Sequence, residues 1–350
     1  MTNLIVGFSS TAPLLLGLLV QPAQSQLSAV FTELGLSTDQ RTAIDAGRPV
    51  AKVLPWGKAS EVFVFGAVYI DGSRATYLKL ARDVTRLAGT PGYLGIGEIP
   101  ENATTADLSG LTLSDDDIKA LKSCKEGDCD VQLPTNAIRA FQQSVNWSAP
   151  DAKDQANALA RSRVLDLVRA YRAGGNAALG VYRDKDHPAQ VAEQFTTMVG
   201  RSAHLPEVLP ELRAYLLNFP EAQLVNGESF FYWEKVDFGL KPTVRINHAV
   251  IYHQGEGTEA VSAVVIKQLY ASHYFHTALD VSVCLHDTTR PERQGFYLLT
   301  LKSSEQDGLT GLKGSILRRI VVGKTQSSLE QALGAIKESV ERGATTSMMR

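Results

Sequence analysis

The sequence lacks the short motifs that mark the commonest catalytic and nucleotide-binding sites. It has no H-E-x-x-H pair, no P-loop, no paired zinc-ribbon cysteines and no G-x-S-x-G elbow. A G-x-G occurs in the segment 93–100 (YLGIGEIP), but no third glycine or helix start follows it, and alternation predicts a strand there instead. These absences disfavour an α/β-hydrolase or a dinucleotide-binding protein, and we expect no metal or other cofactor.

The chain also lacks an excess of charge of either sign. Its 350 residues include 35 Lys and Arg against 37 Asp and Glu, a formal net charge of −2, and the basic residues form no long run. Proteins that bind nucleic acid need a basic surface to neutralise phosphates. We therefore expect no nucleic-acid partner. The apolar fraction of 44% is ordinary for a globular protein with a full core.

Cysteine is scarce, with three residues in the whole chain. Cys124 and Cys129 enclose the turn-forming tetrapeptide KEGD, and in an oxidising compartment this spacing predicts a small-loop disulfide. A zinc site would need further thiolates or imidazoles at paired spacing, and none lies nearby in the sequence. Cys284 remains, on a predicted strand, where we expect it to be buried and inert.

Long apolar runs are absent outside the N-terminus. The run 14–20 (LLLGLLV) is too short to span a bilayer comfortably, and Ala23-Gln24-Ser25 follows it with the small residues that precede a signal-peptidase site. No Lys or Arg precedes the run, so an uncleaved anchor is the alternative. We predict a signal peptide over 1–25 and a periplasmic or secreted protein.

Hydrophobic periodicity predicts an α+β fold, with a curved antiparallel sheet packed on a long C-terminal helix and an inserted helical block. A helical pattern runs from about Leu27 to Leu54, and Leu309, Ile316, Ile320, Leu329 and Leu333 lie on one stripe of the terminal helix. The expected segments are a signal peptide (1–25), a helical lead-in (26–58), the first part of the α+β domain (59–134), a helical insertion (135–225), the second part with the terminal helix (226–342) and a tail (343–350).

The stretch 260–287 is the sharpest candidate for chemistry. Its second strand places apolar residues on one face, and its other face is predicted to carry His276, Asp280, Cys284 and His286. Neighbours on one strand face are roughly 7 Å apart, which suits water-bridged polar groups better than direct ligation of a metal. An enzyme of the hydrolase or cyclase type, acting through His276 and Asp280, is the sharper interpretation, and structural polar groups are the simpler one.

Aromatic residues on the late strands are candidates for lining an apolar cavity, and ordinary core packing is the simpler interpretation of each one. Arg245 would need a partner or an anionic ligand group if it were buried, and would otherwise point to water. We interpret Arg161, Arg163, Asp166 and Arg169 as a solvated helix face. The candidate ligand-binding residues are Phe231, Trp233, Arg245, Tyr252, Tyr270, Tyr274, His276, Asp280 and Tyr297.

Two segments carry a resemblance to a known superfamily. They are EVFVFGAVYIDGSRATYLKLARDVTRL (61–87) and GFYLLTLKSSEQDGLTGLKGSILRRIV (295–321). A buried strand, a helix, several antiparallel strands and a long terminal helix, in this order, resemble the helix-grip fold of the START-like (SRPBCC-type) superfamily. The residues 135–220 depart from that pattern as a large helical insertion. The resemblance implies an apolar cavity between sheet and terminal helix that holds a lipid or another hydrophobic molecule.

These observations favour an exported protein that binds an apolar or amphipathic, lipid-like small molecule, with transient membrane contact allowed. The START-like superfamily includes both carriers and enzymes, and a fold does not assign a function by itself. The enzyme described above remains the first alternative. A protein-interaction module that docks a partner through the helical insertion is the second.

Overall fold

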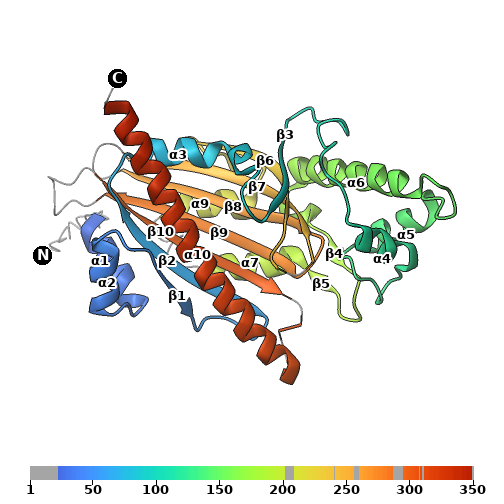
Figure 1. The fold of residues 1–350 in the computed structure, drawn as a ribbon, viewed down its shortest axis with the longest axis horizontal. Helices are drawn as coiled ribbons and strands as arrows, with labels where there is room; N and C mark the ends of the chain where they lie inside the picture. The colour runs from blue at the N-terminus through green and yellow to red at the C-terminus, as the bar shows by residue number, and fades with distance from the viewer. Residues whose placement is uncertain are drawn as a thin grey trace, which may run out of the picture.

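The computed structural model describes residues 23–201, 209–239, 241–255, 260–286, 295–306, 308–309 and 311–348. It is an α+β protein in which eight antiparallel strands form one sheet and a long C-terminal helix crosses one face of that sheet (Figure 1). This confirms the predicted fold class. The predicted signal peptide lies almost wholly outside the described residues, and no helix within them is long and apolar enough to cross a membrane.

The strands lie in the spatial order β1-β2-β10-β9-β8-β7-β6-β3. Strands β6 to β10 each pair with their neighbours in sequence, which is the predicted meander, and β10 pairs back onto β2. Their bounds are β1 (Val50–Leu54), β2 (Glu61–Ile70), β3 (Tyr93–Ile99), β6 (Gly227–Val236), β7 (Thr243–Gln254), β8 (Val261–Ala271), β9 (Phe275–His286) and β10 (Phe296–Gln306).

Strand β2 is buried along its whole length because both of its faces are apolar. Val64 and Val68 belong to the core under the terminal helix, whereas Phe63 and Phe65 belong to the core on the opposite face. The sheet therefore separates two hydrophobic layers, and each layer needs its own cover of helices.

The first layer is covered by α10 (Gly311–Met348), α3 (Arg74–Arg82) and the short 3-10 helix η1 (Val84–Leu87). Leu329 and Leu333 of α10 are buried against β2, where Gly66 lacks a side chain. A Cβ atom built on Gly66 would lie only 2.7–2.8 Å from atoms of these two leucines. At this point α10 therefore lies directly on the sheet, without room for a ligand between them.

Replacing Gly66 with alanine is expected to destabilise the fold by about 1–3 kcal/mol, because the added methyl group must displace Leu329 and Leu333. Gly323→Ala on α10 is the control, since a Cβ there meets nothing within 4 Å. In an exposed helix interior that change should stabilise by about 0.5–1 kcal/mol. Urea unfolding of both variants checks this, and a neutral Gly66→Ala would show that α10 does not press on β2.

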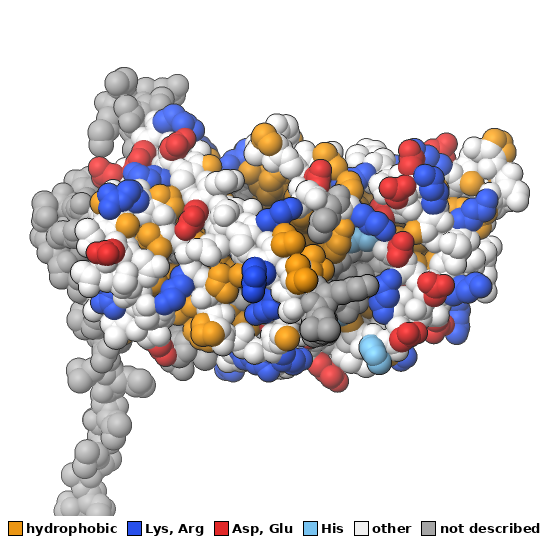
Figure 2. All heavy atoms as spheres, turned by 60° about the horizontal axis from the view of Figure 1, so that its bottom comes forward, with side chains coloured by type: hydrophobic (Ala, Val, Ile, Leu, Met, Phe, Trp, Pro, Cys, Tyr) orange, Lys and Arg blue, Asp and Glu red, His pale blue; other side chains and the backbone are white. Residues whose placement is uncertain are grey.

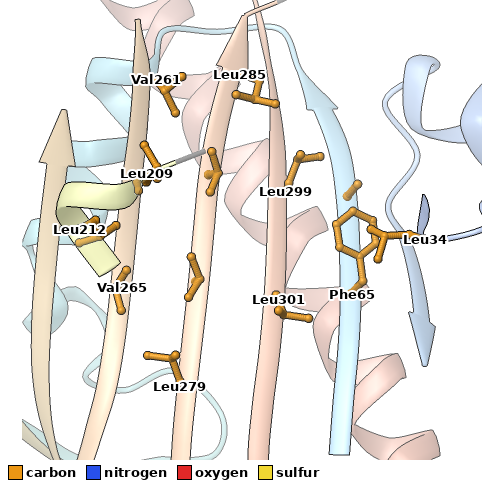
Figure 3. Packing of buried hydrophobic residues seen from close by; sticks show 14 of the residues in the cluster. Leu34, Phe65, Leu209, Leu212, Val261, Val265, Leu279, Leu285, Leu299 and Leu301 are labelled. Atoms are coloured by element: carbon orange, nitrogen blue, oxygen red, sulfur yellow. The ribbon is translucent and has the colours of Figure 1, made fainter. Parts of the chain in front are cut away.

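The second layer lies under α1 (Ala23–Glu33), α2 (Thr38–Asp45), α7 (Val191–Arg201) and α9 (Pro210–Asn218). Figure 3 shows how this layer is filled: Leu34, from the segment before α2, meets Phe65 of β2, and Leu212 of α9 approaches Val265 of β8. Helices far apart in sequence thus share one apolar face of the sheet.

The predicted insertion, 135–225, contains α5 (Thr135–Ser144), α6 (Ala152–Gly174), η2 (Gly175–Ala178) and the paired two-residue strands β4 (Val181–Tyr182) and β5 (Ala189–Gln190), followed by α7 and α9. α4 (Asp115–Ser123) precedes it in the chain. α4, α5 and α6 gather at one end of the sheet (Figure 1). Cys124, at the end of α4, forms the predicted disulfide with Cys129, with an S–S distance of 2.07 Å. Cys284 is buried, as expected.

Some local predictions are wrong. Residues 50–54 are not helical but form β1, because Gly47 and Pro49 end the preceding helical pattern and β2 offers an edge to pair with. Ile316 and Ile320 of the predicted stripe are 68% and 52% exposed. They lie where α10 reaches the rim of the sheet, since Arg318 donates to the carbonyl of Glu61 at the start of β2. Within the predicted tail, α10 continues to Met348.

Candidate functional site

A cleft of about 870 Å³ lies between α5, α6, β4 and the ends of β7 and β8. Leu133, just before α5, and Phe141 on α5 line it together with Leu167 on α6. Val244 and Leu269 contribute from the sheet. Its volume is within the range of about 300–1,000 Å³ that is usual for small-molecule sites.

The helices that form the cleft are held in place by buried apolar side chains. Ile138 is buried from α5, and Val164, Leu165, Val168 and Tyr171 are buried from α6. The α6 residues pack on the second face of the sheet, next to Phe231 and Ile246. α5 packs on α4 through a separate apolar cluster that includes both disulfide cysteines. The cleft is the gap that remains where these two clusters meet.

The walls of the cleft are mainly apolar, and two tyrosines complete them. Tyr182 of β4 lies edge to face with Tyr270 of β8, with ring centroids 6.2 Å apart. Burial raises the pKa of both phenols above the ordinary value, so both hydroxyls stay neutral at physiological pH. The inner wall therefore presents uncharged, largely hydrocarbon surface to a ligand.

The charged residues that line the cleft are Arg139, Arg163, Arg183 and Asp166. Arg163 and Asp166 are one turn apart on α6 and form an ion pair of 3.1 Å. Arg139 pairs with Glu126, which does not line the cleft, at 3.4 Å with both side chains well exposed. The lining thus has three positive charges and one negative charge, although the chain as a whole is close to neutral.

Of the nine predicted ligand-binding residues, Tyr270 is the one found among the residues that line this cleft. Phe231 and Trp233 lie nearby in the core between α6 and the sheet. The Trp233 ring fills the space left by glycines of β3, since Cβ atoms on Gly95 and Gly97 would lie within 3.0 Å of it. The glycines of that strand therefore allow the Trp233 ring to approach the backbone closely.

The other three predicted tyrosines have structural partners. Tyr252 donates to Glu211 at 2.6 Å and Tyr297 donates to Asp45 at 2.7 Å, so each ties a strand to a helix of the second layer. Tyr274, in the turn between β8 and β9, accepts a hydrogen bond from the backbone N–H of Lys241 at 2.8 Å. Its φ of 64° is a conformation that a bulky residue seldom adopts.

Arg245 has its own partners within the protein. Its Nη1 lies 3.0 Å from Glu234 Oε1, and its Nε donates to Gln268 at 3.1 Å. Asn247 donates to the same Glu234 oxygen at 3.1 Å. Burial is the largest single influence and opposes the charge of the guanidinium, but Glu234 and Asp280, with smaller contributions from Tyr232 and Tyr93, together outweigh it and raise the pKa of Arg245. Arg245 is therefore a member of a buried ion pair and does not line the cleft.

His276 and Asp280 do not share a strand face, contrary to the sequence-based prediction. The register between β9 and β10 shifts at Glu305, so that Thr277 and Phe275 have partners across the ladder and His276 is skipped. This bulge reverses the alternation: the His276 ring lies 6.2 Å from that of Tyr182, whereas Asp280 pairs with Lys302 on the other side. His276 and Asp280 therefore do not form the acid–base pair that the enzyme interpretation requires.

A buried polar cluster lies on the second face of the sheet, and the sequence analysis did not identify it. Lys267 of β8 is fully buried and donates to Tyr171 at 2.9 Å and to Asn176, with the Phe195 ring 3.8 Å from its Nζ. His248 of β7 stands opposite it in the ladder, with Nδ1 3.3 Å from the Tyr171 hydroxyl. Among the described residues, no carboxylate pairs with Lys267 and no partner bonds His248 Nε2.

Desolvation by burial lowers the pKa of Lys267 well below its ordinary value. It also lowers the pKa of His248 to about 3, with smaller contributions from the charges of Lys267 and Arg172. A run of apolar residues around one lysine, VVIKQLY at 264–270, was the signal in the sequence for a buried amine.

Within the part of the chain that the structure describes, no group of three or more His, Cys, Asp or Glu residues is arranged to hold a metal ion. Figure 2 shows one face of the molecule with basic and acidic side chains interspersed and apolar ones gathered near its centre.

Comparison with protein-family models and with curated protein sequences gave no match.

Proposed function

We propose that this protein binds an apolar or amphipathic small molecule in the cleft between α5, α6, β4 and the ends of β7 and β8. The observation that carries the proposal is the combination of volume and lining. The cleft measures about 870 Å³, and its walls include Leu133, Phe141, Leu167, Leu269 and Tyr270. Burying a ligand's apolar area against such walls is favourable by roughly 25 cal/mol per Å².

The site proposed here differs in place from the one that the START-like resemblance implies. The order of a buried strand, a helix, an antiparallel meander and a long terminal helix supports a relationship at the level of the fold. However, α10 lies directly on β2 at Gly66, and most of the residues that line the cleft belong to the predicted insertion. In this proposal the insertion supplies the binding site and α10 supplies stability.

We further propose that the protein acts outside the cytosol. The Cys124–Cys129 disulfide supports an oxidising compartment, because reduced thiols prevail in the cytosol. A lipid-like ligand is poorly soluble in water, so an exported carrier would enclose it in the cleft. The enzyme alternative has lost its support, since the bulge in β9 separates His276 from Asp280.

A neutral apolar probe, N-phenylnaphthylamine, tests the proposal, since its fluorescence rises in apolar surroundings. We expect saturable binding with one site per chain and an affinity in the micromolar range. Ala140→Trp, which fills the cleft from α5, should weaken binding by about tenfold or more, equivalent to about 1.4 kcal/mol. Ala335→Trp, on the exposed side of α10, is the matched control and should leave binding unchanged.

Thermal unfolding of both variants should show that they remain folded. Binding that is absent in the wild type, or equal in Ala140→Trp and Ala335→Trp, would remove the proposal.

A further inference from the structure

We infer that the cleft selects amphipathic molecules that carry an anionic oxygen group, a carboxylate or a phosphate, and that Arg163 binds this group. The inference rests on the proposed function and names the class of ligand that the cleft accepts. It starts from the charges of the lining, where three arginines face one carboxylate although the whole chain has a net charge of −2.

Arg163 is the arginine with an unmet hydrogen-bonding requirement. Its Nη2 pairs with Asp166 Oδ2 at 3.1 Å on the same helix. Its Nε is buried and has no acceptor among the described residues. The side chain as a whole is 40% exposed, so a small rotation would bring this N–H to the cleft. A ligand oxygen that accepts from it there would recover the cost of a buried N–H without an acceptor, about 1–3 kcal/mol. The planar guanidinium also matches the geometry of carboxylate and phosphate oxygens.

Two further arginines are positioned to support the same charge. Arg139 is held by Glu126 in a pair whose side chains are 68% and 45% exposed, and such exposed pairs contribute at most about 1 kcal/mol. Arg183, directly after β4, lines the cleft and is exposed to solvent. Both can turn towards an anion at little cost, and Asp166 is the one acidic residue in the lining that opposes it.

The apolar wall and the arginines together define the ligand. The wall formed by Leu133, Phe141 and Leu167 favours a hydrocarbon body, and a cationic ligand would meet the arginines with repulsion. A neutral alcohol could bury its chain and accept one hydrogen bond from Arg163, but it would bring no negative charge to the three arginines of the lining. An anionic amphiphile meets both requirements, and fatty acids and alkyl phosphates share this chemistry.

Displacement of N-phenylnaphthylamine by three ligands of equal chain length tests the inference: dodecanoate, dodecyl phosphate and dodecanol, all below their aggregation concentrations. We expect at least one anion to bind about tenfold more tightly than dodecanol, which corresponds to about 1.4 kcal/mol for one partly exposed charged hydrogen bond. The anion that binds more tightly identifies the head group as a carboxylate or a phosphate.

The variants then assign the effect to Arg163. Arg163→Met keeps the aliphatic stem and should reduce the preference for the anion to less than about twofold, with dodecanol binding unchanged. Asp166→Asn should strengthen anion binding, because it removes the opposing charge. Arg342→Met, on α10 with a side chain 72% exposed, lowers the net charge equally and should change nothing.

Different results would overturn the proposed function and the inference about Arg163. If the neutral probe does not bind the wild type, the proposed function fails. If the probe binds but dodecanol displaces it as well as both anions do, or if Arg163→Met keeps the preference, the inference about Arg163 is overturned while the cleft remains a binding site.

Discussion

Arg245→Met is expected to destabilise the protein by about 3–5 kcal/mol, the usual cost of removing one partner from a buried ion pair. The Arg245 and Glu234 side chains are 15% and 4% exposed. The substitution leaves the Glu234 carboxylate buried with Asn247 as its remaining hydrogen-bond donor among the described residues, and it leaves the Gln268 oxygen without the Arg245 donor. Urea unfolding of the variant measures the loss.

The loss of stability should depend on how deeply an ion pair is buried, and not on the distance between its charged atoms. Lys153 and Asp115 are closer together, at 2.6 Å, but their side chains are 56% and 74% exposed. Lys153→Met should therefore cost far less than Arg245→Met, since water screens an exposed pair. The double variant Arg245→Met/Glu234→Gln should recover part of the lost stability, because it removes the orphaned charge. If Arg245→Met cost no more stability than Lys153→Met, the description of Arg245 and Glu234 as a buried ion pair would be contradicted.

The second large effect is a dependence of stability on pH that arises from Lys267 and His248. Both are bases whose native pKa lies below the unfolded value, so the unfolded chain binds a proton that the native protein excludes. Stability therefore rises with pH, by up to about 1.4 kcal/mol per pH unit for each proton. For His248 the window lies between the native pKa of about 3 and the unfolded value of 6.5.

Lys267→Met removes the buried amine at nearly constant volume. The difference in unfolding free energy between this variant and the wild type should shift in favour of the variant as pH falls from 10. His248→Phe should flatten the dependence between pH 6 and 4, and the new ring would still stack on Phe231, whose centroid lies 4.6 Å from that of His248. Urea unfolding at several pH values measures both. Parallel pH profiles for the wild type and both variants would show that neither group is held uncharged.

Sequence patterns predicted those elements whose structure depends on residues close together in the chain. β2 was predicted as a buried strand because both of its faces are apolar after Glu61, and the disulfide was predicted because Cys124 and Cys129 are only five residues apart. The capping box at Ser114, with Asp117 three residues later, is another local signal, and α4 begins at it. In each case the determining groups are close together in the chain.

The site could not be predicted in the same way because it is formed by pairing and packing over long range. The orientation of His276 depends on a bulge against β10, which is a property of two strands and not of one. The cleft joins Leu133, Phe141, Leu167 and Tyr270, whose helices and strands meet only after folding. Arg163 has the polar neighbours of a solvated helix face, and only the position of α5 places it beside an apolar wall.

The proposed function requires that a ligand binds in the cleft beside α5 and α6. Crystals grown with a bromine-labelled dodecanoic acid test it most directly, because anomalous scattering locates the bromine without assumptions about the chain. We predict a bromine peak among Leu133, Phe141 and Leu167, with the carboxylate at Arg163. A bromine peak between α10 and the sheet, or none at saturating ligand, would contradict it.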